Sequence, residues 1–493
     1  MMRNGAAYLS SLNDGRIVWL GQQKVGNVTS AAAFRNAAQS FAQLYELSHD
    51  PASRAALTYL DPASDTRHAL SFLIPRSYEE LVSKRIAHKT WAEESFGFLG
   101  RSPDYMASGI AGFAARPDVF AGGDFDGSAN VLSLYRRTAE QDLFVAFTIT
   151  NPKIDKAKSL AQQGPGNDIG VRTVRETDGG IVVSGAKSIG TAAIFADEII
   201  VGTIEPLSQD DVDYALSFTV TPATPGVTLI SRDSYEHAAR SREDNPLSSR
   251  FDENDALLVL DNVFIPWEQV LTYRDIQRTF AMWWETPAYT NMAHQASVRF
   301  WTKLEFLAGL ASLVCDSHGS AGNPQARAQL GRLLGYVQLA KSTVLAAEAG
   351  HETKAEDDGV VRLNREITYA QRILAGEIYP KFIHELRMLC GGALIQLPDS
   401  LHDLDHPDIG PMLRRFIRSS AQSADERIRL MKLVWDASGS AFASRHAHYE
   451  QFYQGAPHVY LAQMTFTGLA EKYGRFASQA LAGKNETGGP DNH

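Results

Sequence analysis

The stretch ALLVLDNVFIP at residues 256–266 is the part of the sequence that decides the fold. Six similar runs precede it and are also short and rich in Val, Ile, Phe and Thr: LFVAFTIT (143–150), DIGVRTV (168–174), GGIVVSGAK (179–187), DEIIVGTI (197–204), YALSFTVT (214–221) and GVTLIS (226–231). Glycine, proline and aspartate separate the runs, as in the turn signal Asp178-Gly179-Gly180. Runs of β-forming residues at this spacing predict an antiparallel barrel or sandwich between residues 141 and 272.

Helical patterns flank this β region on both sides. From about residue 30 to residue 115, segments such as SAAAFRNAAQSFAQLYELSHD (30–50) carry apolar residues at helical spacing. After Pro266-Trp267 the helical pattern returns and is apolar on more than one stripe, as in a bundle or at a subunit interface. We therefore predict an N-terminal helical domain at 1–140, a middle β domain at 141–272, a C-terminal helical bundle with oligomer contacts at 273–482, and a disordered polar tail at 483–493.

The composition restricts the partners and the compartment. The chain has 493 residues and a formal net charge of -10, so it lacks the attraction to nucleic acid phosphates that a basic protein has. Its two cysteines, Cys315 and Cys390, are too few for a disulfide framework and fit a reducing cytoplasm. No stretch approaches the roughly 20 apolar residues of a membrane span, and the N-terminus lacks the apolar core of a signal peptide. We expect a soluble cytoplasmic protein that binds neither nucleic acid nor membrane.

Two motifs resemble binding sites but have simpler interpretations. In Gly164-Pro165-Gly166-Asn167-Asp168-Ile169-Gly170 the third glycine comes one place late for a dinucleotide fingerprint, so a β-turn connection is the better interpretation. Without a site for NAD(P)H, any electrons must come from another protein. His402-Asp403-Leu404-Asp405-His406 could ligate a divalent metal, but Pro398 and Pro407 bracket it and an exposed acidic loop would look the same. We predict no metal site.

A series of motifs follows in order along nearly the whole chain. They are Gly-Arg-Ser-Pro-Asp-Tyr at 100–105, Asn-Pro-Lys-Ile-Asp-Lys at 151–156, Gly185-Ala186-Lys187 leading to Thr191, PLSSRFDEND at 246–255, DNVFIPW at 261–267, KLVWDASGSAF at 432–442, Arg445-His446 and YEQFY at 449–453. Together they resemble the oxygenase components of the 4-hydroxyphenylacetate 3-monooxygenase family, which includes chlorophenol and nitrophenol monooxygenases.

The resemblance implies a fold and an activity. The fold is similar to that of acyl-CoA dehydrogenases, with an N-terminal helical domain, a middle antiparallel β-barrel and a C-terminal helical bundle, assembled as a homotetramer. The activity uses FAD as FADH2, delivered by diffusion from a separate NAD(P)H:flavin reductase, together with O2. A C4a-hydroperoxyflavin then hydroxylates a small phenolic aromatic, with or without displacement of a halide or nitro group.

Three residues are the catalytic candidates under this resemblance. A phenol is most nucleophilic as the phenolate, so the site needs a cation or hydrogen-bond donors and a base. Arg101 can supply the cation, although an arginine in an ordinary turn would look the same. Tyr105 can reach the same pocket, or it can be a core tyrosine. His294 is the candidate base, with a satisfied helical histidine as the alternative.

Phe147 is a departure from the family pattern. The phenylacetate hydroxylases carry Thr-His-Thr on the strand before Asn-Pro, and their histidine contacts the phenol hydroxyl, whereas this chain has Ala146-Phe147-Thr148. A phenylalanine neither donates nor accepts a hydrogen bond. We therefore expect 4-hydroxyphenylacetate to be a poor substrate and Phe147 to contact a more apolar or differently anchored aromatic.

The resemblance also implies where the flavin lies. Thr148, Asn151 and Thr191 are placed along its ring and ribityl chain, where hydroxyl and amide groups serve as hydrogen-bond partners. Lys153, Lys156 and Arg445 could serve the pyrophosphate, and the lysines could equally be solvated surface charges. The remaining predicted flavin contacts, from the C-terminal region, are Gly439, Ser440 and Phe442. The acidic segment at 206–214 resembles a loop that closes over substrate, or is a plain surface hairpin.

Three other functions are consistent with parts of this sequence. An acyl-CoA dehydrogenase-like flavoenzyme would need a carboxylate base and tightly held FAD. A 4-hydroxybutyryl-CoA dehydratase would need an iron-sulfur cluster, which Cys315 and Cys390 alone cannot build. A non-catalytic flavin-binding homologue is favoured by Phe147 and disfavoured by the presence of Arg101, Tyr105 and His294.

Overall fold

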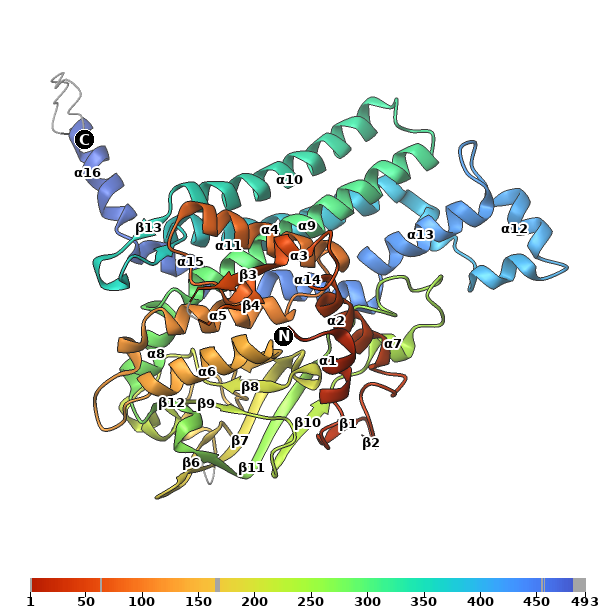
Figure 1. Cartoon of the computed structure of the whole chain (residues 1–493). Coiled ribbons are helices and arrows are strands. Elements are labelled where there is room, and N and C mark those ends of the chain that lie inside the picture. Colours follow the sequence, from red (N-terminus) through yellow and green to blue (C-terminus); the bar gives the residue numbers. More distant parts are fainter. Residues whose placement is uncertain (1, 63, 165–168, 454, 456, 482–493) are drawn as a thin grey trace.

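Two β-sheets in the middle of the chain lie between helices from both ends of the sequence (Figure 1). The structure is a computed structural model that describes residues 2–62, 64–164, 169–453, 455 and 457–481. The larger sheet has the order β2 (Gln23–Val25), β1 (Val18–Leu20), β10 (Val227–Ser231), β11 (Asp255–Pro266), β7 (Gly180–Thr191) and β6 (Arg172–Thr177). The smaller sheet has the order β12 (Val270–Tyr273), β9 (Leu216–Val220), β8 (Glu198–Val201) and β5 (Val145–Thr148).

Each of the predicted runs contains a strand, but the strand directions and the source of two edge strands differ from the expectation. The strands of the predicted β region pair into two separate sheets, as in the predicted sandwich, and the barrel stays a prediction. The pairs β1–β10 and β5–β8 are parallel, so neither sheet is purely antiparallel. Strands β1 and β2 come from residues 18–25, inside the region predicted to be helical, because they add to the edge of β10.

The long antiparallel pair β7–β11 is the centre of the larger sheet. Val259 lies opposite Ala186 and Ile265 lies opposite Ile181, with two irregularities in register between them. Gly185 lies in this pair at φ +123°, and a Cβ there would be 2.1 Å from the carbonyl oxygen of Gly170. The glycine of the Gly-Ala-Lys motif is therefore required by close backbone approach.

The helices group around the sheets in chain order. Before the smaller sheet come α1 (Gly5–Ser11), α2 (Arg35–Leu47), α3 (Arg54–Leu57), α4 (Tyr78–Glu94), α5 (Pro103–Ala114) and α6 (Ser128–Gln141), and α7 (Tyr235–Ala238) lies within the β region. After it come α8 (Ile276–Trp284), α9 (Ala288–Ser317), α10 (Pro324–Ala349), α11 (Arg365–Cys390), α12 (Gly410–Phe416), α13 (Ala424–Ser438), α14 (Ala441–Phe452), α15 (Pro457–Gln463) and α16 (Leu469–Leu481). The predicted boundaries at 140 and 272 stay predictions, and the tail from 483 lies outside the described residues.

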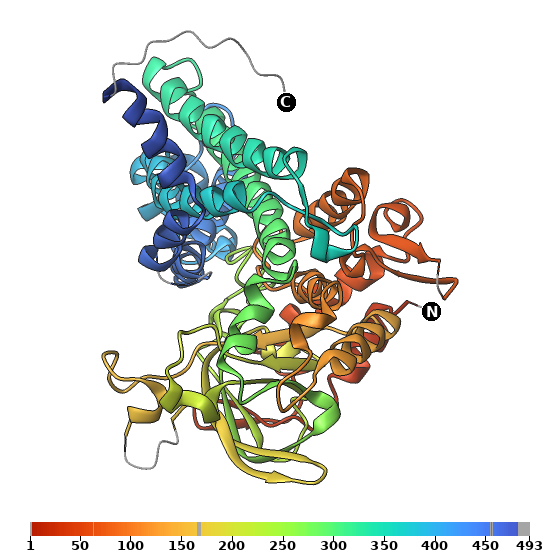
Figure 2. The same ribbon diagram turned by 90° about the vertical axis from the view of Figure 1, so that its left-hand side faces the viewer.

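Helix α9 connects the two helical groups. It packs against α4 and α5 on one side and against α10 and α11 on the other, and the long helices α9 and α10 run together in Figures 1 and 2. Its residues 290–304 are all buried, which agrees with a helix that is apolar on more than one stripe. The same helix therefore supplies part of the cavity wall described below.

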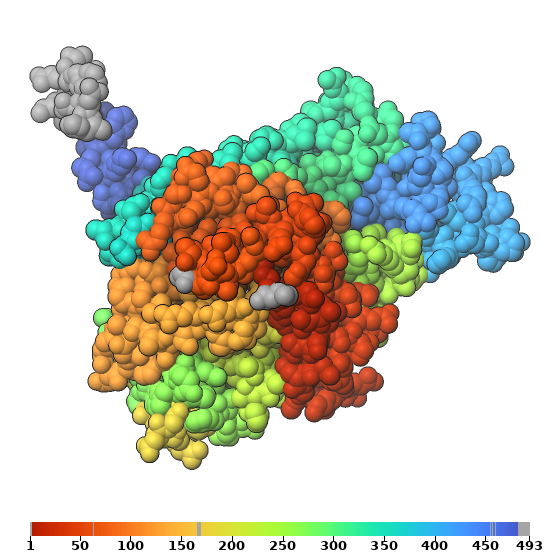
Figure 3. Space-filling view, viewed as in Figure 1, coloured from red at the N-terminus to blue at the C-terminus, as the bar shows by residue number. Residues whose placement is uncertain are grey.

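Two segments project from the body in Figure 3. The arm that carries α12 and α13 extends at one edge, and α16 extends at the opposite edge. Exposed apolar side chains are found on and just before α16, with Phe476 at 75% and Phe466 at 85% exposure. Among the helices that the structure describes, none combines the length and the apolarity of a membrane span.

Candidate active site

A cavity of about 410 Å³ lies where the smaller sheet meets α5, α8, α9 and α14. This volume is in the range of pockets that hold small organic molecules. Much of its wall is aromatic or apolar, with Phe147, Trp283, Trp284, Tyr289, Met292 and Tyr453 among the lining residues. Arg101, Arg372 and Arg445 also line it, so the cavity is an apolar space with cationic groups in its wall.

Arg101 is the residue that precedes the first turn of α5. Ser102 is the N-cap and Pro103 starts the helix, which fixes the chain direction at this point. The Arg101 side chain is buried, its Nη2 donates to the carbonyl oxygen of Tyr453 at 3.1 Å, and its guanidinium lies 4.0 Å from the ring centroid of Tyr105. Within the described residues, Nη1 has no hydrogen-bond partner and no carboxylate lies within 4.0 Å of the guanidinium. An anionic oxygen in the cavity would therefore satisfy both the charge and the free N–H groups.

Tyr105 and Phe147 lie beside Arg101. Their rings stack with centroids 5.7 Å apart, and the ring of Phe147 lies 6.1 Å from that of Trp283. The structure thus brings Arg101, Tyr105 and Phe147 together in one wall. Phe147 contributes only an apolar surface, so Arg101 and Tyr105 are the polar groups at this point.

Tyr449 of α14 closes the cavity behind Arg101. Gly100 makes room for its phenol ring, since a Cβ at residue 100 would lie 2.4 Å from the Tyr449 hydroxyl oxygen. The ring is stacked on Tyr453 at 5.0 Å, and Arg101 lies 5.4 Å from its centroid. Burial raises the pKa of Tyr449 above the ordinary range, so the phenol is neutral at physiological pH.

Gly100→Ala is expected to destabilise the protein by about 1–3 kcal/mol, because the added methyl overlaps the Tyr449 ring. It should also lower turnover, since Tyr449 must move away from Arg101. Denaturant unfolding and steady-state kinetics measure the two effects. Gly335→Ala is the control, because Gly335 lies within α10 and its added methyl meets nothing within 4 Å. Equal stability of Gly100→Ala and wild type would contradict this account.

Arg445 and Thr191 share one carboxylate. Arg445 donates to both oxygens of Asp255 at 2.9 and 2.7 Å and to Glu253 at 2.6 Å, and Thr191 Oγ1 donates to Asp255 at 2.6 Å. Burial acts to raise the pKa of Asp255, but Arg445 outweighs it and holds the pKa well below the usual range. The charge of Arg445 is therefore already compensated by the protein, although both Arg445 and Thr191 line the cavity.

The other predicted flavin contacts of the β region do not line this cavity. Asn151 accepts a hydrogen bond from Lys187 Nζ at 2.7 Å and donates to Thr203 Oγ1 at 3.3 Å. Lys153 forms an ion pair with Glu205 at 2.7 Å, and Lys156 is exposed. Thr148 is fully buried on β5, and its hydroxyl has no hydrogen-bond partner within the described residues.

The predicted contacts at 439–442 serve the junction of α13 and α14. Ser440 caps α14 by accepting from the backbone N–H of Ala443 at 3.1 Å. Phe442 is buried and stacks on Phe98 at 5.5 Å. A Cβ at Gly439 would lie 2.6 Å from the Trp435 ring. The structure does not bring these residues to the cavity.

His294 lies behind the cavity wall. Its Nε2 is 2.8 Å from Glu348 Oε1, and its ring forms an edge contact with His88 at 5.6 Å. Met292 and Ala293 line the cavity, but an α-helix turns by about 100° per residue, and His294 faces α4 and α10 instead. The structure therefore does not bring the predicted base together with Arg101 and Tyr105.

His294→Ala is expected to destabilise the protein by about 1–3 kcal/mol, because among the described residues the Glu348 carboxylate then keeps only Arg85 as a partner, at 2.9 Å. Denaturant unfolding beside His384→Ala, an exposed histidine, measures this effect. A catalytic base would give a different result, in which turnover falls by about 100-fold or more while stability is unchanged. That outcome would return His294 to the catalytic role.

Some cavity residues were not predicted. Trp283, Trp284, Tyr289 and Arg372 line it, and the aromatic density of residues 283–289 was the available signal.

The segment at 206–214 contains a 3-10 helix (Gln209–Tyr214), and its closing role stays a prediction. Residues 165–168 of the glycine-rich motif lie outside the described residues. In the part of the chain that the structure describes, no group of three or more His, Cys, Asp and Glu residues could hold a metal ion, and His402 lies 3.8 Å from Asp405 on the surface.

The fold and the cavity define a class of protein in which helices and sheets enclose an arginine-containing aromatic pocket. The sequence profile described as 4-hydroxyphenylacetate 3-hydroxylase N terminal matches residues 4–272, and that described as the C terminal matches residues 280–482. The chain belongs to the 4-hydroxyphenylacetate 3-hydroxylase family.

Relatives in this family match most of the chain. The 4-hydroxyphenylacetate 3-monooxygenase oxygenase component of Pseudomonas aeruginosa is 36% identical, over 92% of this chain and 86% of its own. The oxygenase component of a 4-nitrophenol 2-monooxygenase from Rhodococcus sp is 34% identical, over 97% of this chain and 92% of its own. A crystal structure of a 4-hydroxyphenylacetate 3-monooxygenase oxygenase component, complexed with FAD and 4-hydroxyphenylacetate, has a TM-score of 0.91 at 32% identity and covers 97% of this chain and 99% of that chain.

Proposed function

We propose that this chain is the oxygenase component of a two-component flavin monooxygenase, which uses reduced FAD and O2 to hydroxylate a phenolic or related aromatic. One observation carries the proposal. A buried guanidinium, that of Arg101, has an N–H group with no partner among the described residues and lines an aromatic cavity in a member of this family. Such a group is suited to the oxygen of a phenolate.

Each residue of the cavity has its own role in the proposed reaction. Arg101 stabilises the phenolate and so lowers the pKa of the substrate hydroxyl, and Tyr105 beside it orients the same oxygen through its own hydroxyl. Phe147 and Trp283 hold the faces of the ring and exclude water. When bound, FADH2 supplies the reducing equivalents for O2 activation. His294 supports α9 through Glu348, and we assign it a positioning role.

The flavin would lie along the wall that Thr191 and Arg445 provide. The buried Thr148 hydroxyl and the Trp284 N–H have no partner within the described residues, which fits a cofactor with many hydrogen-bonding groups. Asn151 with Lys153 and Lys156 lies on the segment that follows β5, where a ribityl chain and a pyrophosphate could reach them. The segment 206–214 would close over the substrate, and Gly439, Ser440 and Phe442 would support Arg445 from the start of α14.

We also propose an oligomeric state for the protein and a source for its reduced flavin. A homotetramer with an acyl-CoA-dehydrogenase-like arrangement would cover the exposed apolar side chains Phe466 and Phe476 of the projecting C-terminal segment. FADH2 would arrive by diffusion from a separate NAD(P)H:flavin reductase in the cytoplasm.

In the test, an unrelated flavin reductase supplies FADH2, and the conversion of a set of phenols to hydroxylated products is measured. Hydroxylated product that depends on this chain, with anaerobic binding of FADH2 measured beside it, is the expected result. A control without the chain measures flavin autoxidation. Binding of FADH2 without product from any phenol would point to a non-catalytic flavin protein. Purification with tightly held oxidised FAD would favour a dehydrogenase-like enzyme.

Phe147→His is expected to raise kcat/KM for 4-hydroxyphenylacetate about tenfold, the effect of one well-formed hydrogen bond to the phenol oxygen. The imidazole would lie where the Phe147 ring now contacts Tyr105. Steady-state kinetics on 4-hydroxyphenylacetate and on a phenol without a carboxylate give the specificity ratio. Phe147→Leu is the control, because it keeps an apolar side chain. An unchanged ratio in Phe147→His would show that Phe147 does not determine specificity.

A further inference from the structure

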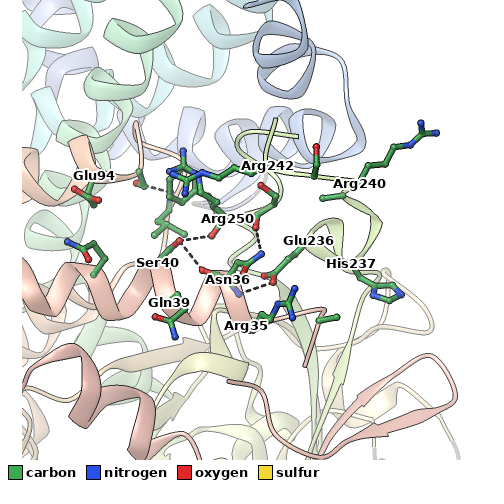
Figure 4. A pocket seen from close by; sticks show the side chains of 18 residues that line it. Arg35, Asn36, Gln39, Ser40, Glu94, Glu236, His237, Arg240, Arg242 and Arg250 are labelled. Carbon is green, nitrogen blue, oxygen red and sulfur yellow. Dashed lines mark hydrogen bonds between the residues drawn. The ribbon is translucent and has the colours of Figure 1, made fainter. Parts of the chain in front are cut away.

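A second cavity, of about 670 Å³, lies on another part of the molecule and shares no lining residue with the aromatic cavity. It is formed by α2, the end of α4, residues 236–242 and residues 249–251 (Figure 4). Four arginines line it, namely Arg35, Arg240, Arg242 and Arg250, against the two carboxylates of Glu94 and Glu236. The wall is therefore net positive, although the whole chain has a net charge of -10.

Glu236 and Arg240, two of the charged residues that line the cavity, already have partners within the protein. Glu236 accepts from the backbone N–H groups of Asn36 and Ala37 at 2.8 and 3.0 Å, so its carboxylate serves the N-terminus of α2. Arg35 lies near Glu236 and attracts it. Arg240 extends away from the cavity in Figure 4 and forms an ion pair with Asp399. Arg242 and Arg250 therefore carry the excess positive charge, and Glu94 is the remaining carboxylate of the wall.

Arg242 and Arg250 lie side by side in Figure 4 and repel one another. Burial and then Arg242 lower the pKa of Arg250, while Glu94 acts in the opposite direction. Arg250 Nε donates to the carbonyl oxygen of Pro246 at 3.0 Å, which holds the guanidinium in place. Within the described residues, neither arginine has a carboxylate within 4.0 Å, and the Nη atoms of both have no hydrogen-bond partner.

Ser249 adds an independent sign of a ligand. Its side chain is 5% exposed and lines the same cavity, and its hydroxyl has no hydrogen-bond partner in the part of the chain that is described. A buried hydroxyl without a partner costs free energy, which a ligand oxygen would recover. Two guanidinium groups and a hydroxyl beside one space match the oxygen atoms of a phosphate group.

We propose that this cavity binds a phosphate group, either as the free ion or as part of a small phosphate monoester. The ligand would lie between Arg242 and Arg250, relieve their repulsion and accept from Ser249. Phe251 and His237 are the aromatic residues of the lining, and Phe251 is itself buried. The inference does not depend on flavin chemistry, because the two cavities share no residue.

The test is calorimetric titration of the full chain with inorganic phosphate and with glycerol 3-phosphate, at an ionic strength held constant with sodium chloride. The double variant Arg242→Gln/Arg250→Gln removes the charges. The matched control is Arg175→Gln/Arg327→Gln, which removes two exposed arginines that have no ion pair in the described part of the chain. We expect saturable binding to wild type and to the control, with an affinity about tenfold or more lower in the double variant of the cavity.

The outcomes separate the two sources of phosphate. Tighter binding of glycerol 3-phosphate than of inorganic phosphate would identify a phosphorylated metabolite, and equal or weaker binding would identify the free ion. Equal affinities in wild type and in Arg242→Gln/Arg250→Gln, or no saturable binding of either probe, would overturn the proposal. Phenol hydroxylation measured on the same variants should be unchanged, so failure of this site and failure of the proposed oxygenase function would be distinguished.

Discussion

Replacing Arg101 by methionine is expected to lower kcat/KM for the phenolic substrate about 100- to 1000-fold, the effect of removing one charged group that stabilises a developing anion. The side chain lies in the cavity wall, and among the described residues it has no carboxylate partner that would be left behind. Methionine keeps much of the apolar volume that packs on Tyr105. The substitution should therefore lower kcat/KM while it leaves the free energy of unfolding nearly unchanged.

The pH profile distinguishes this role from simple packing. In the proposed mechanism Arg101 holds the substrate oxygen as an anion, so without it the phenol should ionise near its ordinary pKa of about 10. The activity of Arg101→Met should then rise toward alkaline pH, where wild type has already reached its plateau. Arg101→Lys keeps the charge but loses the planar fork and should fall between the two. A variant that is folded, with unchanged kcat/KM and an unchanged pH profile, would remove Arg101 from the mechanism.

The strands and the Arg101–Tyr105 pair were predictable because both depend on local sequence. Runs such as ALLVLDNVFIP form strands in any sheet order, and Arg101 and Tyr105 lie four residues apart across the start of one helix. The parallel edge of the larger sheet was not predictable, because it depends on β1 and β2 adding to β10, which is about 200 residues away in the chain. Likewise the sequence showed that Phe147 lies on a strand, but its stacking on Tyr105 depends on how α5 crosses that strand.

The predicted site residues that the structure does not bring to the cavity as free groups have a common physical reason. His294 has the right chemistry, but the rotation of α9 about its axis is set by packing against its neighbouring helices, and this rotation directs the imidazole to Glu348. Arg445 was predicted to serve the flavin pyrophosphate, and the structure shows that Glu253 and Asp255, about 190 residues earlier, compensate its charge. Side-chain type indicates what a group can do, whereas its partners depend on tertiary contacts that a single sequence does not contain.

Glu450→Gln is expected to destabilise the protein by about 3–5 kcal/mol, the effect of breaking a buried ion pair on one side. Glu450 accepts from Arg299 Nη1 and Nη2 at 2.7 and 2.8 Å and from Lys303 Nζ at 2.6 Å. All three side chains are at most 1% exposed. Glutamine has the same shape but no charge, so two buried cations would lose their counterion.

The pH dependence of the unfolding free energy tests whether the ionised Glu450 carboxylate stabilises the fold. Burial acts to raise the pKa of Glu450, but Arg299 and Lys303 outweigh it and hold the pKa at about 2, below the ordinary 4.5. A carboxylate with a lowered pKa in the folded state stabilises the fold fully above pH 4.5 and loses this contribution as the pH falls toward 2. The difference in unfolding free energy between wild type and Glu450→Gln should therefore shrink over that window.

Urea unfolding of wild type, Glu450→Gln and the exposed control Glu268→Gln between pH 7 and pH 3 measures this difference, and the control should stay within about 0.5 kcal/mol of wild type. The network also connects to the cavity, since Arg299 lies 5.3 Å from the Tyr449 ring centroid and Tyr449 lies beside Arg101. A loss of stability in Glu450→Gln should for this reason be accompanied by weaker substrate binding. Unfolding at the wild-type urea midpoint at pH 7 would show that the buried cations are compensated in another way.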